Sequence, residues 1–178
     1  MLIYNEGALD IKMTVNIEQL TIKEKWKERF KVLYDIEQQQ KESIAKGEKV
    51  TVSPYGKYFS FLAFIFGPFY YMYHRMFKKA WLILVLSMIA SIAYTLVEIA
   101  LGQSLGFFMP GIFVAIICAM IFNYDYYRKV VHQDDTWPSL KFAMSSSWLC
   151  FLYFVISIIV VWFLFEYLDS NGLLIIYY

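Results

Sequence analysis

The sequence predicts an all-α integral membrane protein, a bundle of membrane helices preceded by an amphipathic cytoplasmic helix. Hydrophobic residues make up 60% of the chain, an excess that a soluble domain of this size has too small a core to bury. The charges are also unevenly placed. Residues 1–57 hold ten Lys/Arg and nine Asp/Glu, whereas residues 58–178 hold six of each. A charged soluble region followed by an apolar membrane region accounts for both observations.

The soluble region is expected to span residues 1–53, with an amphipathic helix over about 22–46. Trp26, Phe30 and Leu33 recur at helical spacing, and charged residues fill the opposite face. This apolar face is a candidate docking face. It is expected to pack on the membrane part of the same chain, to associate with a second copy or another protein, or to lie on an anionic lipid surface.

The ends of this helix also have local signals. Thr21 and Glu24 stand at the spacing of a capping box, in which the hydroxyl and the carboxylate satisfy free backbone amides. Gly47 is expected to stop the helix, because glycine readily adopts the left-handed conformation common after a helix C-terminus.

The membrane domain is expected over residues 54–178. A span needs around 20 apolar residues to cross about 30 Å of hydrocarbon. Three runs in this part of the chain meet that requirement, and they are residues 80–101, 107–124 and 142–165.

Residues 58–77 differ from these spans. Nine of the sixteen residues in 58–73 are aromatic, and Gly67 and Pro68 interrupt the run. Proline removes an amide donor and clashes with the preceding turn, so a helix must break or kink there. The segment is therefore predicted to be a re-entrant or interfacial broken helix, with a short kinked span as the alternative.

The distribution of basic residues favours the re-entrant prediction. Basic clusters precede and follow the broken segment and also lie between the last two spans. They share one side only if the segment does not cross, and the positive-inside rule makes that side cytoplasmic. The N-terminus is then cytoplasmic and the C-terminus extracytoplasmic. Since the first residues lack the pattern of a signal peptide, insertion is expected to be directed by the internal apolar segments.

Small residues at four-residue intervals predict a packing seam between the first two complete spans. Such spacing lets membrane helices approach closely, and hydroxyls can bond across the contact. In an antiparallel hairpin the two stripes come into register. The predicted seam consists of Ser87, Ser91 and Thr95 on one helix and Gly111, Ala115 and Ala119 on the other.

The sequence contains no recognisable catalytic constellation, cofactor motif or metal-ligand spacing, so we expect a protein that is not an enzyme and binds no cofactor. The net charge of +1 gives no indication of a nucleic-acid partner. Glu98, inside a predicted span, is expected to reach interfacial water at the helix end. Asp125 and Asn123 are expected to pair locally with Arg128 and Lys129.

The basic residues after the broken segment are candidate contacts for anionic lipid headgroups. Arg75, Lys78 and Lys79 follow a run of Tyr and Phe side chains that suit the bilayer interface. The lipid bilayer is therefore the expected partner of this part of the chain.

The run Phe59–Leu84 resembles the hallmark segment of an uncharacterised bacterial inner-membrane family, domain of unknown function 2628. The aromatic FGPF-type motif and the basic turn after it carry the resemblance. The matching positions are Phe64, Phe66, Gly67, Pro68, Phe69, Tyr73, Arg75 and Met76. Two weaker elements, 25–30 and 123–128, extend the resemblance to about residues 20–132, and the chain beyond Thr136 looks like an addition.

The resemblance implies a bacterial inner-membrane location and supplies no catalytic residues. The first function hypothesis is a non-catalytic interaction or accessory subunit that docks through the face formed by Trp26, Phe30 and Leu33. The second is a transporter or channel component in which the Gly67 break and Glu98 converge on a polar pathway. The third is a membrane-surface protein that contacts lipid.

Overall fold

The computed structural model describes residues 17–50, 52–103 and 109–172, and over these ranges every regular element is helical, which confirms the predicted fold class. Four helices are long and the other elements are short. The long helices are α1 (Glu24–Ala45), α4 (Phe77–Leu101), α5 (Met109–His132) and α6 (Ser147–Ser170). The short elements are α2 (Phe61–Phe66), α3 (Pro68–Tyr73) and the 3-10 turns η1 (Ile17–Gln19) and η2 (Pro138–Leu140).

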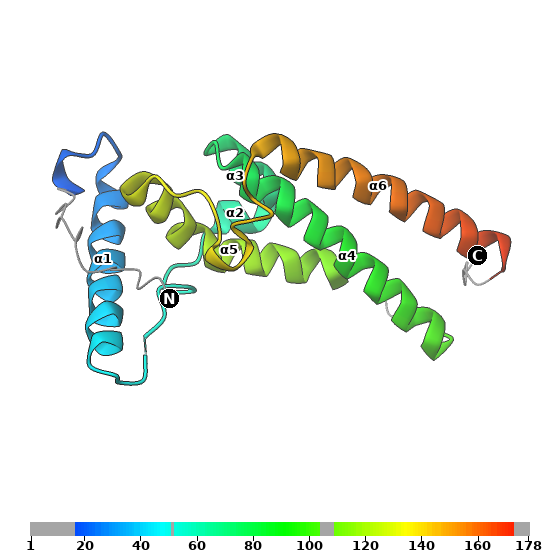
Figure 1. The fold of residues 1–178 in the computed structure, drawn as a ribbon, viewed down its shortest axis with the longest axis horizontal. Coiled ribbons are helices and arrows are strands. Elements are labelled where there is room, and N and C mark those ends of the chain that lie inside the picture. Colours follow the sequence, from blue (N-terminus) through cyan, green and yellow to red (C-terminus); the bar gives the residue numbers. More distant parts are fainter. Residues whose placement is uncertain (1–16, 51, 104–108, 173–178) are drawn as a thin grey trace, which may run out of the picture.

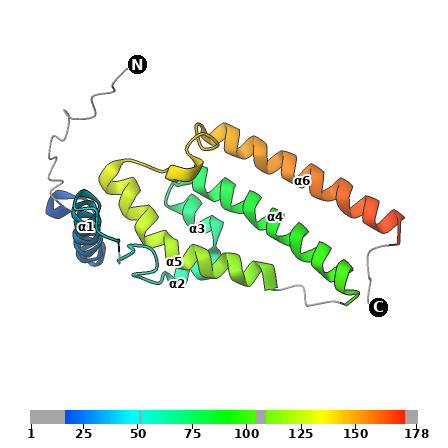
Figure 2. The same ribbon diagram turned by 60° about the horizontal axis from the view of Figure 1, so that its bottom comes forward.

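Helices α4, α5 and α6 run side by side, with α4 in the middle, and α1 lies across one end of this group (Figures 1 and 2). All three are long and apolar enough to cross a membrane. At about 1.5 Å per residue, each exceeds the roughly 30 Å of a hydrocarbon core. We call the end at which α1 lies the α1 end.

Helix α1 confirms the predicted amphipathic helix to within two residues at its start and one at its end. Its N-terminus corrects the expected capping box, because Lys23 is the capping residue and its side chain makes no cap hydrogen bond. The helix ends before Gly47, which adopts a φ of 69° as the sequence predicts for a stop signal.

The predicted break in the aromatic segment is present between α2 and α3. Gly67 joins the two helices at φ 49°, a conformation that residues with a Cβ rarely adopt. Pro68 then occupies the first turn of α3, where its missing amide proton breaks no helical hydrogen bond. Ser60 caps α2 by accepting a hydrogen bond from the amide of Ala63.

The segment before α2 is fixed against the middle of α5 by two backbone hydrogen bonds. The amide of Gly56 donates to the carbonyl of Met120 at 3.1 Å, and that of Ser60 donates to Ala119 at 2.9 Å. After the break, α3 leads directly to the start of α4 at the α1 end. The first half of the broken element therefore packs on α5 and the second half on α4.

The long helices differ in extent from the predicted spans. Helix α5 continues to His132, eight residues past the expected end, and α6 begins at Ser147 because Ser146 caps it by accepting from Leu149. Residues 1–16 of the expected soluble region and residues 107–108 of the expected third run lie outside the described residues.

The main core lies at the α1 end, where α3, α4 and α5 meet. Its buried members include Tyr71, Ala80, Ile83, Cys118 and Phe122. Away from this core the apolar faces of α4 and α6 stay exposed, as expected for helices whose outer surface contacts lipid.

The predicted seam does not hold at two of its positions. Ser91 is exposed, and a Cβ added at Gly111 would meet no atom within 4 Å, so no neighbouring helix approaches closely there. The hydroxyls of Ser87 and Ser91 donate instead to carbonyls of their own helix, at 2.7 and 2.9 Å. Ala119 is buried, but it packs against the segment that leads into α2.

Helix α4 packs more extensively on α6 than on α5, and large side chains make the contacts with α6. On the side facing α6, Trp81 packs edge-on against Phe151 with ring centroids 5.0 Å apart, and its ring also lies 5.2 Å from that of Phe154. Further along, the hydroxyl of Ser157 lies 3.0 Å from the sulfur of Met88. Spacing alone did not indicate which face of α4 meets which neighbour.

Candidate functional site

A buried polar cluster joins α3, α4, α5 and the connection to α6. The ammonium of Lys79 lies 2.7 Å from the carboxylate of Asp125, and both side chains are fully buried. Trp137 donates its indole N–H to both carboxylate oxygens, at 3.1 and 3.2 Å, and the hydroxyl of Tyr71 donates at 3.3 Å. Each oxygen of Asp125 thus accepts hydrogen bonds, the condition under which a buried ion pair is tolerated.

This cluster corrects two expectations. Asp125 was expected to pair with Arg128 and Lys129 nearby, but its partner is Lys79, 46 residues away in the sequence. Lys79 was a candidate headgroup contact, and its complete burial removes it from that role. In a buried region of low dielectric, a charged side chain is stabilised most by the nearest opposite charge in space. The separation of the two residues along the chain does not matter.

The other basic residues of this end have separate partners. Arg128 pairs with Asp134, Lys78 lies 3.5 Å from Asp135, and Lys129 donates to the carbonyl of His74 at 2.8 Å. Arg75 is exposed, so it stays available to a headgroup.

Helix α1 packs on the aromatic C-terminal half of α5 through the apolar face that the sequence analysis singled out. Phe30 and Leu33 are almost completely buried. The Trp26 ring packs edge-on against Tyr126 with centroids 4.8 Å apart, and the Phe30 ring contacts Tyr127 at 5.4 Å. The face consisting of Trp26, Phe30 and Leu33 therefore meets the same chain, one of the alternatives that the sequence allowed.

Polar contacts also hold α1 in place. Arg29 donates to the side-chain carbonyl of Asn123 at 2.9 Å. Glu37 accepts from the hydroxyl of Tyr127 at 2.9 Å and contacts the Nε2 of His132 at 2.9 Å. Burial acts to raise the pKa of Glu37, but the His132 and Tyr127 contacts outweigh it, so the pKa lies below its ordinary value.

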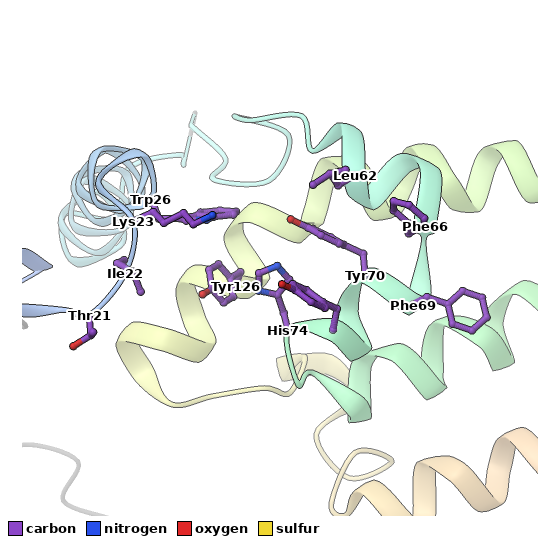
Figure 3. A pocket seen from close by; sticks show the side chains of 11 residues that line it. Thr21, Ile22, Lys23, Trp26, Leu62, Phe66, Phe69, Tyr70, His74 and Tyr126 are labelled. Carbon is purple, nitrogen blue, oxygen red and sulfur yellow. The ribbon is translucent and has the colours of Figure 1, made fainter.

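An aromatic cavity of 650 Å³ lies between the start of α1, the broken element and α5. This volume falls within the range of small-molecule sites, about 300–1,000 Å³. Most of its lining is apolar or aromatic (Figure 3). The lining residues are Thr21, Ile22, Lys23, Trp26, Leu62, Phe66, Phe69, Tyr70, Tyr73, His74 and Tyr126.

His74 is enclosed by the aromatic rings of the cavity. Its ring contacts Tyr70 at 4.8 Å, Tyr126 at 4.5 Å and Phe122 at 5.1 Å between centroids. Its Nε2 is buried and makes no hydrogen bond, the only such side-chain atom among the described residues. Burial, and then the charge of Lys129, lower the pKa of His74, so the imidazole is neutral at pH 7.

The cavity has a polar end and an apolar end. In Figure 3, Lys23 and Trp26 lie on the α1 side with the hydroxyl of Tyr70 pointing toward that side, whereas Phe66 and Phe69 lie at the opposite end, on the broken element. Burial raises the pKa of Tyr70, so its hydroxyl remains a protonated donor. Lys23 is the one charged residue among the eleven that line the cavity.

The motif residues of the broken segment separate into two groups in the structure. Phe66, Phe69 and Tyr73 line the cavity. The others determine the path of the chain around it. Gly67 and Pro68 make the break, and the ring of Phe64 contacts that of Phe59 with centroids 5.9 Å apart. In the turn before α4, Arg75 adopts a φ of 59° and Met76 is buried.

Sequence reasoning missed Tyr71 and Trp137, which complete the polar cluster, and His74 as a cavity residue. The ion pair between Lys79 and Asp125 could have been predicted from one feature of the sequence. The two residues carry opposite charges at the ends of apolar segments, and an antiparallel hairpin brings these ends to the same side. No three His, Cys, Asp or Glu side chains among residues 17–50, 52–103 and 109–172 are grouped so that they could hold a metal ion.

Comparison with known families gives one match. The family described as "Protein of unknown function (DUF2628)" matches residues 35–132, from within α1 to the end of α5. The match leaves out the 25–30 element and the start of α1 that forms the polar end of the cavity. It also leaves out α6, in line with the view of the last segment as an addition. No curated protein and no solved structure matches the chain.

Proposed function

Because the chain belongs to the DUF2628 family, whose members share a description of unknown function, we propose a role from its own geometry. It is a small multi-pass protein of the bacterial cytoplasmic membrane that binds a membrane amphiphile and has no catalytic activity. The observation that carries this proposal is the aromatic cavity between α1 and the broken element. The chain then serves as a lipid-contacting accessory protein.

The arrangement of charges supports the orientation in this proposal. Lys57, Arg75, Lys78, Arg128 and Lys129 belong to segments at the α1 end, whereas the ionisable residues toward the other ends of α4 and α6 are acidic. By the positive-inside rule, the α1 end faces the cytoplasm. Helices α4, α5 and α6 then cross the bilayer, and α6 carries the chain toward the extracytoplasmic side.

The broken element fits an interfacial or re-entrant position. Its outward side chains are large and apolar, and Phe61 and Phe69 are each 66% exposed. Exposing these apolar side chains to water is unfavourable, whereas the inner leaflet of the bilayer would bury them. The element would therefore lie in the cytoplasmic leaflet with the cavity at the level of the headgroups.

The transporter alternative receives less support. It requires the Gly67 break and Glu98 to converge on one pathway. Gly67 lies near the α1 end, whereas Glu98 is in the last turn of α4, at the opposite end of that helix. At about 1.5 Å per residue, Glu98 lies roughly 30 Å along α4 from the turn that joins α3 to α4. The six residues of α3 after Gly67 are too few to close that distance.

Lipid retention tests the proposal. The protein would be purified in mild detergent and its bound lipid counted by native mass spectrometry. In Thr21→Trp an exposed residue at the cavity wall is replaced by a large ring that fills the space, and we expect bound lipid to fall several-fold. Lys25→Trp, on the charged face of the first turn of α1 and outside the cavity lining, is the control. Equal retention by the wild type and Thr21→Trp would contradict the proposal.

A further inference from the structure

The cavity combines a single charged lining residue with an apolar interior, and this combination constrains what it can bind. Lys23 supplies a positive charge, and no Asp or Glu lines the cavity to oppose it. An aromatic lining with a nearby carboxylate would suit an organic cation. Here the charge has the opposite sign, so a cation would be repelled.

Further basic groups surround the same space. The guanidinium of Arg29 lies 5.4 Å from the centroid of the Trp26 ring, and Trp26 lines the cavity. The ammonium of Lys129 donates a hydrogen bond to the backbone carbonyl of His74 at 2.8 Å. Both make contacts of their own, but their charges still add to the local potential, which is screened little in a partly apolar site. The cavity is therefore electropositive.

Uncharged donors are available beside these cations. The neutral imidazole of His74 has one ring nitrogen, Nε2, that is buried without a partner, and a buried polar atom of this kind usually has a hydrogen-bond partner. The hydroxyl of Tyr70 points toward the α1 side of the cavity, on which Lys23 lies (Figure 3). An anionic group placed between them could accept from Lys23 and Tyr70, and the ring of His74 lines the same space.

The apolar end supplies the second half of the ligand. Leu62, Phe66 and Phe69 line it, and each is about half exposed or more on the surface that would face the acyl chains of the inner leaflet. A chain placed along these residues could continue into the hydrocarbon without crossing a polar surface. The direction from Lys23 to Phe69 is also the direction from the α1 end into the bilayer.

We propose that the cavity is a binding site for an anionic phospholipid, with the phosphate and headgroup at Lys23, Tyr70 and His74 and an acyl chain along Leu62, Phe66 and Phe69. This inference rests on the proposed function and specifies its ligand class. It differs from a general surface contact because it assigns the headgroup to α1 and the chain to the broken element.

The test measures headgroup preference with delipidated full-length protein in detergent. Dioleoyl phosphatidylglycerol and dioleoyl phosphatidylcholine have the same chains and differ in net charge, and each would be titrated with binding followed by native mass spectrometry. The anionic lipid should bind more tightly. Since one Lys near an anionic lipid contributes about 1 kcal/mol, Lys23→Gln should weaken its binding about fivefold. The zwitterionic lipid, whose choline cation offsets the same phosphate, should lose less affinity.

Three further measurements make the result specific to the site. Lys25→Gln removes the same charge from the same helix outside the cavity and should change binding by less than twofold. His74→Gln, a second variant at the polar end, should also reduce the preference for the anionic lipid. Glycerol phosphate, which has the headgroup chemistry without the chains, should compete only weakly.

The outcomes separate this inference from the proposed function. Saturable binding of both lipids with equal affinity would overturn the anionic assignment and leave the proposed function intact. Binding that Lys25→Gln weakens as much as Lys23→Gln would overturn the assignment to this cavity. Competition by glycerol phosphate at the affinity of the whole lipid would overturn the role of the acyl chain. Absence of saturable binding of either lipid would contradict both proposals.

Discussion

The buried polar cluster and the aromatic cavity share two helices, α3 and α5, yet the polar groups of the cluster satisfy one another and the cavity is open. Tyr71 and Asp125 belong to the cluster, and their immediate neighbours in sequence, Tyr70 and Tyr126, line the cavity. In the cluster the carboxylate of Asp125 has three donors. In the cavity the Nε2 of His74 has none.

This difference separates a structural role from a binding role. Polar groups that satisfy one another fix the position of helices and leave no room for a ligand. A cavity lined by aromatic rings and a few polar groups leaves room that a ligand can fill. Changes in the cluster should therefore affect stability, and changes in the cavity should affect binding.

The largest expected effect is at the centre of the cluster. Asp125→Ala leaves the ammonium of Lys79 buried without a counter-charge and should lower the free energy of unfolding by about 3–5 kcal/mol. Thermal unfolding in detergent measures the change, and Asp169→Ala, at an exposed site on α6, is the control. The double variant Lys79→Met/Asp125→Leu should recover much of the loss, because it removes both charges together. A loss below 1 kcal/mol for Asp125→Ala would contradict a structural role.

The second prediction compares the adjacent tyrosines directly. Tyr71→Phe removes a buried hydrogen bond to a carboxylate and should lower stability by about 1.5 kcal/mol. Tyr70→Phe should change stability by less than about 0.5 kcal/mol but weaken binding of the anionic lipid. Both variants would be followed by thermal unfolding and lipid titration. A reversed pattern, with stability lost at Tyr70 and binding lost at Tyr71, would refute the division between the two regions.

The smallest expected effect concerns the attachment of α1, which forms one wall of the cavity. Because the pKa of Glu37 is lower in the folded protein than its ordinary value of 4.5, the ionised carboxylate contributes stability above about pH 4.5. That contribution is lost as the pH falls through the folded-state pKa. Glu37→Gln should lower stability by about 1 kcal/mol at pH 6.

The pH dependence provides the check on this third prediction. The difference in unfolding midpoint between the wild type and Glu37→Gln should shrink as the pH is lowered below 4.5. Lys41→Gln, which removes a more exposed partner of Glu37 at 3.5 Å, should have a smaller effect at every pH. A difference that stays constant down to pH 3.5 would show that ionised Glu37 does not hold α1.

The sequence predicted those features that depend on local patterns. The spacing of Trp26, Phe30 and Leu33 predicted α1, Gly67 with Pro68 predicted the break, and long apolar runs predicted three membrane helices. Each is determined by neighbouring residues, because helix periodicity, backbone freedom and hydrophobic length act within a few turns.

Long-range partners could not be predicted in the same way. The pairing of Lys79 with Asp125, and the indole of Trp137 that completes it, depend on how α4, α5 and the connection to α6 come together. The expected seam did not hold at Gly111 for the same reason, since spacing identifies a face but not the neighbour that meets it. The cavity could not be predicted either, because its two ends come from segments about 40 residues apart.

The most direct test of the central claim is to locate a bound lipid with two photoreactive probes. Both would be phosphatidylglycerol analogues, one with a diazirine near the headgroup and the other with a diazirine at the end of an acyl chain. The account predicts that the headgroup probe labels the peptide holding Thr21–Trp26, that the chain probe labels Phe66 and Phe69, and that unlabelled phosphatidylglycerol competes with both. Labelling of the exposed faces of α4 and α6 alone, without competition, would contradict it.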